Sequence, residues 1–366
     1  MALVFILFAF LFFLSCAPSS VPVEKTAIER DAQSSSPGQG EWDRILSEAK
    51  KEGKVVIYGS HGPDLRDSLS EAFKKSYGLN IEWVSGRSSE LIPKIKAERR
   101  AGLFLGDVFI TSSQSLLTIK DLGLLERLEK ELILPEVTGP AFWMEERLPW
   151  VDGERFIIAP SQSPSYAYIT NIQKVKASEV SSYKDLLNPV WKGRIASVDP
   201  RITGSRAWVV LAEMMGWDYV SQLAAQVRFA SDQRQAVEWT AKGKTDITFS
   251  PGEPFMDFLQ AGAPLEVIHP LEGVYLGGGG SALSLMSHRP QPHASRVFVN
   301  WYLSKEGQQF LSYTHGYMRK DLDTSQVHPS RKRAPGVKYF SIEREDWLRW
   351  ATEAEKKLKE VLREIE

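Results

Sequence analysis

Apolar residues along the chain follow two spacings, one typical of strands and one typical of helices. Runs rich in β-branched and aromatic residues occur at 54–59, 80–86 and 106–111. Apolar residues then recur at helical spacing after each run. A second set of such units begins at 194–212 and continues to a strand at 246–250. This alternation predicts an α/β protein with two parallel sheets, each covered by helices on both faces.

Polar residues directly follow several of the predicted strands. Ligands of such sheets lie beyond the carboxyl ends of the strands, so these residues are candidates for a binding site. They are Ser60, His61, Ser112 and Ser113 in the first unit and Glu253 in the second. We expect the two units to face one another across a cleft.

The turn at 199–206 connects a strand-like run to a helical pattern. Thr203 or Ser205 is expected to cap the helix, which would leave backbone N–H groups and the positive end of its dipole facing a ligand. Arg206 adds a cation. We therefore predict that Thr203, Gly204, Ser205 and Arg206 bind the electron-rich end of a ligand. The simpler alternative is that the two hydroxyls only cap a helix.

The first fourteen residues are all apolar and precede Cys16, the only cysteine. This run is too short to span a bilayer comfortably and is typical of a secretory signal. The sequence Phe-Leu-Ser-Cys at 13–16 resembles the lipobox of bacterial lipoproteins, in which the cysteine carries lipid. We predict a signal peptide at 1–15, a flexible tether at 16–41 and a lipid at Cys16 that anchors the exported protein to a bacterial membrane. A plain signal peptide or an uncleaved anchor is the alternative.

Composition excludes several classes of function. The 366 residues are 43% hydrophobic and 25% charged, which suits a globular protein large enough for two lobes. A formal net charge of -1 argues against a nucleic-acid partner. The six histidines show no compact zinc spacing, and no Gly-x-Ser-x-Gly elbow occurs. The four glycines at 277–280 lack the lysine of a phosphate-binding loop and are expected to form a hinge.

Several motifs stand in the order found in the extracellular solute-binding proteins of ABC importers, especially their ferric-iron-binding group. They are WKGRI at 191–195, Asp-Pro at 199–200, Thr-Gly-Ser at 203–205, the helical pattern at 294–303 and Ser-x-x-Gly-Gln at 304–308. The resemblance covers residues 50 to 320. It implies a two-lobed, periplasmic-binding-protein-like (type II) fold with a hinge. The expected N-terminal lobe is 50–155 with 270–312, and the expected C-terminal lobe is 156–269 with 313–366.

The resemblance also implies a function. A monomer in the periplasm or at the cell surface would capture a small molecule or ion between its lobes and deliver it to a membrane permease, with neither catalysis nor a cofactor. Two alternatives remain open. One is an exported serine hydrolase that uses Ser60, His61 and Glu253, and the other is a sensory receptor that presents the closed lobes to a signalling partner.

Ferric ion is one solute that the resemblance suggests. Ferric-binding relatives often carry adjacent tyrosines after the strand that here ends at 249–250, whereas this chain has Pro-Gly-Glu-Pro-Phe at 251–255. Tyr166, Tyr168 and Tyr275 remain as candidate phenolate ligands. The alternative for these tyrosines is that they pack against the hinge.

Overall fold

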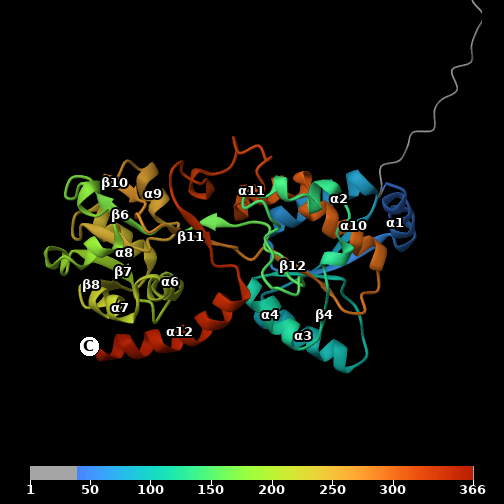
Figure 1. The fold of residues 1–366 in the computed structure, drawn as a ribbon, viewed down its shortest axis with the longest axis horizontal. Coiled ribbons are helices and arrows are strands. Elements are labelled where there is room, and N and C mark those ends of the chain that lie inside the picture. The colour runs from blue at the N-terminus through green and yellow to red at the C-terminus, as the bar shows by residue number, and fades with distance from the viewer. Residues whose placement is uncertain (1–38, 366) are drawn as a thin grey trace, which may run out of the picture. The chain divides into compact units, whose positions relative to one another are not determined.

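The computed structural model describes residues 39–365. The predicted signal peptide, most of the tether and Cys16 lie outside these residues. The described chain contains two five-stranded sheets and one three-stranded sheet (Figure 1). Between residues 39 and 365, no helix combines the length and apolar character that crossing a bilayer requires.

The first sheet has the strand order β2-β1-β3-β12-β4. β1 pairs in parallel with β2 and β3, whereas β12 is antiparallel to both β3 and β4. The strands are β1 (Lys54–Gly59), β2 (Asn80–Ser85), β3 (Val108–Thr111), β4 (Leu125–Glu126) and β12 (Ala282–Met286). The accompanying helices are α1 (Gln39–Glu52), α2 (Pro63–Tyr77), α3 (Ser88–Arg100), α4 (Ser113–Asp121), η1 (Glu129–Glu131), α5 (Pro135–Thr138), η2 (Pro140–Phe142), α10 (Pro292–Leu303) and α11 (Lys305–His315).

The second sheet repeats this scheme with the order β10-β6-β9-β7-β8. β7 is parallel to β8 and β9, and β6 is antiparallel to β9 and β10. The strands are β6 (Tyr168–Asn171), β7 (Ile195–Val198), β8 (Val227–Ala230), β9 (Ile247–Phe249) and β10 (Leu265–Ile268). The helices are η3 (Ala177–Glu179), η4 (Tyr183–Leu187), η5 (Pro189–Trp191), α6 (Ser205–Met215), α7 (Trp217–Ala224), α8 (Gln233–Ala241) and α9 (Phe255–Gln260).

The two repeated sheets confirm the predicted two-lobed α/β architecture, but the expectation of purely parallel sheets is wrong. One strand in each sheet, β12 or β6, runs against its neighbours. Each of these strands follows closely on a strand of the third sheet. The chain therefore enters it from the third sheet, and not from a helix that returns over the same sheet.

The third sheet has the order β13-β11-β5 and joins segments that are distant in the sequence. β11 (Val274–Gly277) is antiparallel to β5 (Ser163–Pro164) and parallel to β13 (Tyr339–Ser341). The glycine run follows β11 directly, and Gly279 and Gly280 have φ angles of 54° and 86°. These left-handed conformations favour glycine, which suits a hinge at this point. The exact lobe boundaries stay a prediction.

The C-terminal helix α12 (Glu345–Glu364) packs against α6 and α7 and also against α4. Trp347, Leu348 and Leu358 are buried on its inner face. Arg349 pairs with Asp121 at the end of α4, with 2.7 Å between Nη2 and Oδ1. This terminal helix therefore contacts helices of both lobes. A short 3-10 helix, η6 (Pro329–Arg331), lies in the segment before β13.

Gly307 lies where the start of α11 passes the backbone of α10. A Cβ at this position would lie 2.3 Å from the carbonyl oxygen of Trp301 and 2.8 Å from Cα of Tyr302. We predict that Gly307→Ala lowers the free energy of unfolding by about 1–3 kcal/mol, because the two helix backbones must separate. Thermal denaturation followed by circular dichroism measures the loss. Gly153→Ala is the control, since nothing lies within 4 Å of its added Cβ. Equal losses in both variants would contradict this packing argument.

Candidate functional site

A cavity of about 210 Å³, called here the polar cavity, lies between α6, the turn after β9, β11 and the η6 segment. It is lined by Ser163, Pro164, Ser165, Tyr166, Gly204, Arg206, Ala207, Gln233, Ser250, Gly252, Glu253, Tyr275, Ser330 and Arg331. Five residues proposed from the sequence thus meet at one cavity, namely Tyr166, Gly204, Arg206, Glu253 and Tyr275. Its wall is formed by elements around the second sheet, by β5 and β11 of the third sheet, and by the η6 segment.

The start of α6 differs in detail from the expected helix cap. Gly204 is the N-cap residue, has a φ of 76°, and no side chain caps the helix there. A Cβ on Gly204 would lie 2.9 Å from Cγ1 of Val198, so this corner requires glycine for its conformation and for its space. Ser205 Oγ instead donates to Oε1 of Glu355 on α12, at 3.3 Å, and Thr203 is exposed. The prediction that Thr203 or Ser205 caps α6 is therefore wrong.

Two guanidinium groups line the polar cavity. Arg206 lies over the ring of Trp347, 5.5 Å from its centroid, and no ion pair within residues 39–365 involves it. Arg331 Nη2 is 2.8 Å from Oε1 of Glu253, whose side chain is 69% exposed. An ion pair this exposed contributes little stability. The cavity therefore holds more positive than negative charge, and one of its cations is unpaired.

The turn after β9 has a strained backbone beside the cavity. Ser250 is buried and has a φ of 51°, which is unusual for a residue other than glycine. At Gly252, with a φ of 66°, a Cβ would lie 2.5 Å from the side chain of Gln233. Strained residues of this kind are often found at ligand sites, where the surrounding structure holds them in place. The turn brings Ser250, Gly252 and Glu253 to the cavity wall.

The three tyrosines that were candidate phenolate ligands are not grouped together. Tyr166 and Tyr275 line the polar cavity, whereas Tyr168 is buried in the second lobe, where its Oη donates to the carbonyl of Val180 at 2.6 Å. Tyr166 Oη donates to the carbonyl of Ser330 at 2.8 Å. Burial raises the pKa of all three phenols, so each favours its protonated form. In the described part of the chain, no three His, Asp or Glu side chains form a cluster that could hold a metal ion.

Ser60 and His61 lie at a different depression, of about 400 Å³, with Ser85, Arg87 and Glu90. His61 is 5% exposed, and its Nε2 lies 3.1 Å from Oη of Tyr302. No hydrogen bond joins Ser60 to His61 within the described residues. Glu253 lines the polar cavity instead. The structure therefore does not assemble Ser60, His61 and Glu253 as a catalytic triad would require.

Ser112 and Ser113 make local contacts at the start of α4. Ser112 Oγ accepts from the backbone N–H of Ser115 at 3.3 Å and caps the helix. Ser113 is buried and donates to Glu343, which also accepts from the backbone N–H of Gly278 at 2.8 Å. Both hydroxyls thus have partners within the described residues, and neither lines the polar cavity.

Some residues that line the cavity were not found from the sequence, notably Ser163, Ser165, Gln233, Ser250 and Arg331. Arg331 lies in η6, in a stretch with no motif or periodic pattern. Ser250 stood at the end of a recognised strand, but its backbone conformation is not visible in the sequence. The serine-rich run before Tyr166 was the one signal that could have pointed to this wall.

His61 gives a prediction for acid stability. Burial, followed by the nearby charges of His315 and Arg66, lowers the pKa of His61 to about 3. Below pH 6.5 the unfolded chain therefore binds a proton that folded His61 does not, so stability falls as the pH falls from 6.5 towards 3. We predict that the wild type loses up to about 1.4 kcal/mol per pH unit relative to His61→Gln over this interval.

Urea denaturation of both proteins between pH 7.5 and 4 measures this difference. Gln keeps a nitrogen able to reach Tyr302 but does not titrate. Above pH 6.5 the difference between the two proteins should be constant. A difference that stays constant down to pH 4 would show that His61 is not buried as a neutral group.

Comparison with known proteins gives the family context of this site. The profile of a family described as bacterial extracellular solute-binding protein matches residues 68–319. Iron uptake protein A1 of Synechocystis sp. is 24% identical over 298 residues, which are 76% of this chain and 79% of that protein.

The solved structures similar to this chain include the following two. An ABC transporter structure from Clostridium perfringens has a TM-score of 0.67 at 16% identity, over 85% of this chain and 99% of that chain. A Trichodesmium protein in complex with iron and citrate has a TM-score of 0.61 at 18% identity, over 84% and 99%. At these identities the two structures establish the fold.

Proposed function

The chain belongs to the bacterial extracellular solute-binding protein family, and from this premise we propose that it binds an anionic solute in the polar cavity for delivery to an ABC permease. Membership confirms the resemblance found in the sequence. Solute binding outside the cytoplasm is the function of the family. The anionic character of the solute, the permease and the lipid anchor are our proposals for this chain.

The unpaired guanidinium of Arg206 carries the proposal of an anion. A partly buried charge without a partner is costly, and a ligand of opposite charge removes that cost. Arg331 lies on the same cavity, where it pairs with the exposed carboxylate of Glu253 and donates from Nη1 to Oγ of Ser163 at 3.4 Å. An anion entering the cavity can replace Glu253 as the partner of Arg331 and also pair with Arg206.

Closure of the two lobes is the second part of this proposal. Arg206 and Glu253 belong to the second lobe, whereas Ser163 and Tyr275 lie on the third sheet that joins the lobes. A solute that contacts both sets of residues favours the closed conformation, by as much as its affinity for that conformation exceeds its affinity for the open one. Gly279 and Gly280, with positive φ angles, place flexible backbone where the chain passes from β11 of the third sheet to β12 of the first.

Ferric ion, alone or with an anion, is the second candidate, favoured by the similarity to iron uptake protein A1 and to the Trichodesmium protein in complex with iron and citrate. Binding of iron by Tyr166 would require loss of its hydrogen bond to Ser330 and of a proton that burial retains. An anion needs neither change. Native mass spectrometry of protein purified without refolding distinguishes the two, because it gives the mass of the bound solute directly.

Two substitutions on the cavity test the anion proposal. We predict that Arg206→Gln weakens the binding of inorganic phosphate, or of the solute identified by mass spectrometry, by about 10- to 100-fold, because a hydrogen bond to a charged group is lost. Glu253→Gln should strengthen binding by up to about 5-fold, because the carboxylate that competes with the anion for Arg331 is then absent. Isothermal titration calorimetry measures both. Unchanged affinity in Arg206→Gln, with a normal melting temperature, would place the solute elsewhere.

The proposed lipid anchor is tested at Cys16. We predict that wild-type protein expressed with its own leader is recovered in the membrane fraction, and that Cys16→Ser is recovered in the soluble fraction, because the thiol that accepts the lipid is absent. Fractionation followed by immunoblotting measures the distribution. Ser15→Ala leaves the thiol in place and serves as the control. Soluble wild-type protein with a free thiol would contradict the anchor.

A further inference from the structure

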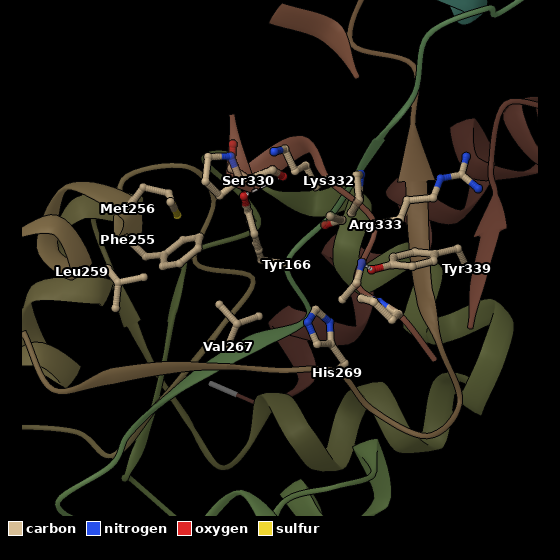
Figure 2. A pocket seen from close by; sticks show the side chains of 15 residues that line it. Tyr166, Phe255, Met256, Leu259, Val267, His269, Ser330, Lys332, Arg333 and Tyr339 are labelled. Carbon is tan, nitrogen blue, oxygen red and sulfur yellow. Dashed lines mark hydrogen bonds between the residues drawn. The ribbon is translucent and has the colours of Figure 1, made fainter. Parts of the chain in front are cut away.

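We propose that the solute is an organic anion with a flat apolar body, and that this body occupies a second cavity next to the polar one. This inference rests on the proposed binding of an anion in the polar cavity and specifies the rest of the molecule. The second cavity, called here the apolar cavity, has a volume of about 430 Å³. Figure 2 shows the side chains that line it.

The two cavities share part of their walls. Pro164, Ser165, Tyr166 and Ser330 line both. The hydrogen bond from Tyr166 to the carbonyl of Ser330 fixes this shared wall. The two cavities are thus neighbours, and in our proposal the ligand extends from Arg206 past Tyr166 into the apolar cavity.

The chemistry of the apolar cavity differs from that of the polar cavity. Helix α9 and strand β10 provide Phe255, Met256, Leu259 and Val267, and Tyr339 lies opposite them (Figure 2). The rings of Tyr166 and Phe255 meet edge to face, with centroids 4.4 Å apart. Such a lining favours an apolar and preferably aromatic group.

Charge around the apolar cavity also fits an organic anion. No carboxylate is found among the described residues that line it, whereas Lys332 and Arg333 are part of the lining. Burial lowers the pKa of His269, so this histidine is uncharged at neutral pH. A cationic ligand would gain no partner there. A neutral ring attached to an anionic group matches the apolar lining of one cavity and the positive charge of the other.

Size supports the same class of ligand. A closed apolar cavity of about 150 Å³ is large enough to bind benzene. The apolar cavity is more than twice this size and accommodates a substituted ring. The polar cavity, with about 210 Å³, suits a phosphate or carboxylate group. A bare metal ion or inorganic anion would leave the apolar cavity unused.

Titration of the intact protein with inorganic phosphate and with phenyl phosphate tests the inference, since both probes share one anionic group. Burial of the ring should make phenyl phosphate bind about 10- to 100-fold more tightly. In the double variant Met256→Gln/Leu259→Gln this advantage should fall at least 5-fold, with phosphate affinity unchanged. Leu271→Gln is the matched control, because Leu271 is 77% exposed and does not line either cavity.

A second measurement reports the position of the ring directly. In protein labelled with ¹³C at the methionine methyl groups, phenyl phosphate should shift the Met256 signal, which the Met256→Gln variant identifies. Inorganic phosphate should leave it in place. Phenyl phosphate that binds no more tightly than phosphate, or that leaves the Met256 signal unmoved at saturation, would overturn the inference.

The outcomes separate this inference from the proposed function. If inorganic phosphate binds and Arg206→Gln weakens it, but the phenyl ring adds nothing, the anion site stands and only the apolar cavity loses its assigned ligand. If neither probe binds, the anion site fails and the inference fails with it.

Discussion

The packing of Arg206 over Trp347 is the interaction on which the proposed site depends. The ring lies on the C-terminal helix, and it holds a guanidinium at the polar cavity without neutralising its charge. A carboxylate in the same place would pair with Arg206 and compete with any anionic ligand. The same helix holds Ser205 through Glu355. The C-terminal helix therefore fixes both residues at the start of α6, although it follows them by about 150 positions in the sequence.

The other cation of the cavity is restrained in a different way. Arg331 pairs with Glu253, but this carboxylate is mostly exposed and its interaction is weak. An anionic solute can take its place at little cost. In the proposed function, the fixed cation attracts the anion and the exchangeable ion pair allows its release to a permease.

Much of the fold could be predicted because its signals are local. Strand-like runs such as 54–59 and 194–198, each followed by a helical pattern, identified the two α/β units and the corner at Gly204. The direction of β6 and β12 could not be predicted in this way, since it depends on how the chain crosses between the sheets. Hydrophobic periodicity reports which residues are buried and carries no information about such crossings.

The candidate site was only partly visible in the sequence for a related reason. Arg206 and Glu253 followed recognisable strands, and the structure places both on the polar cavity. Ser60 and His61 also followed a strand, yet His61 turns into the first lobe towards Tyr302. Arg331 comes from a segment without periodic pattern, and its position is set by tertiary contacts. Local sequence identified strand ends, but it did not determine which of them share one cavity.

A crystal structure of the protein purified without refolding tests the central claim most directly. We expect closed lobes around a bound solute, with an anionic group within hydrogen-bond distance of both Arg206 and Arg331. Glu253 should have moved away from Arg331. A solute bound at Ser60 and His61, or a metal ion coordinated by Tyr166 and Tyr275 with Arg206 uninvolved, would contradict it.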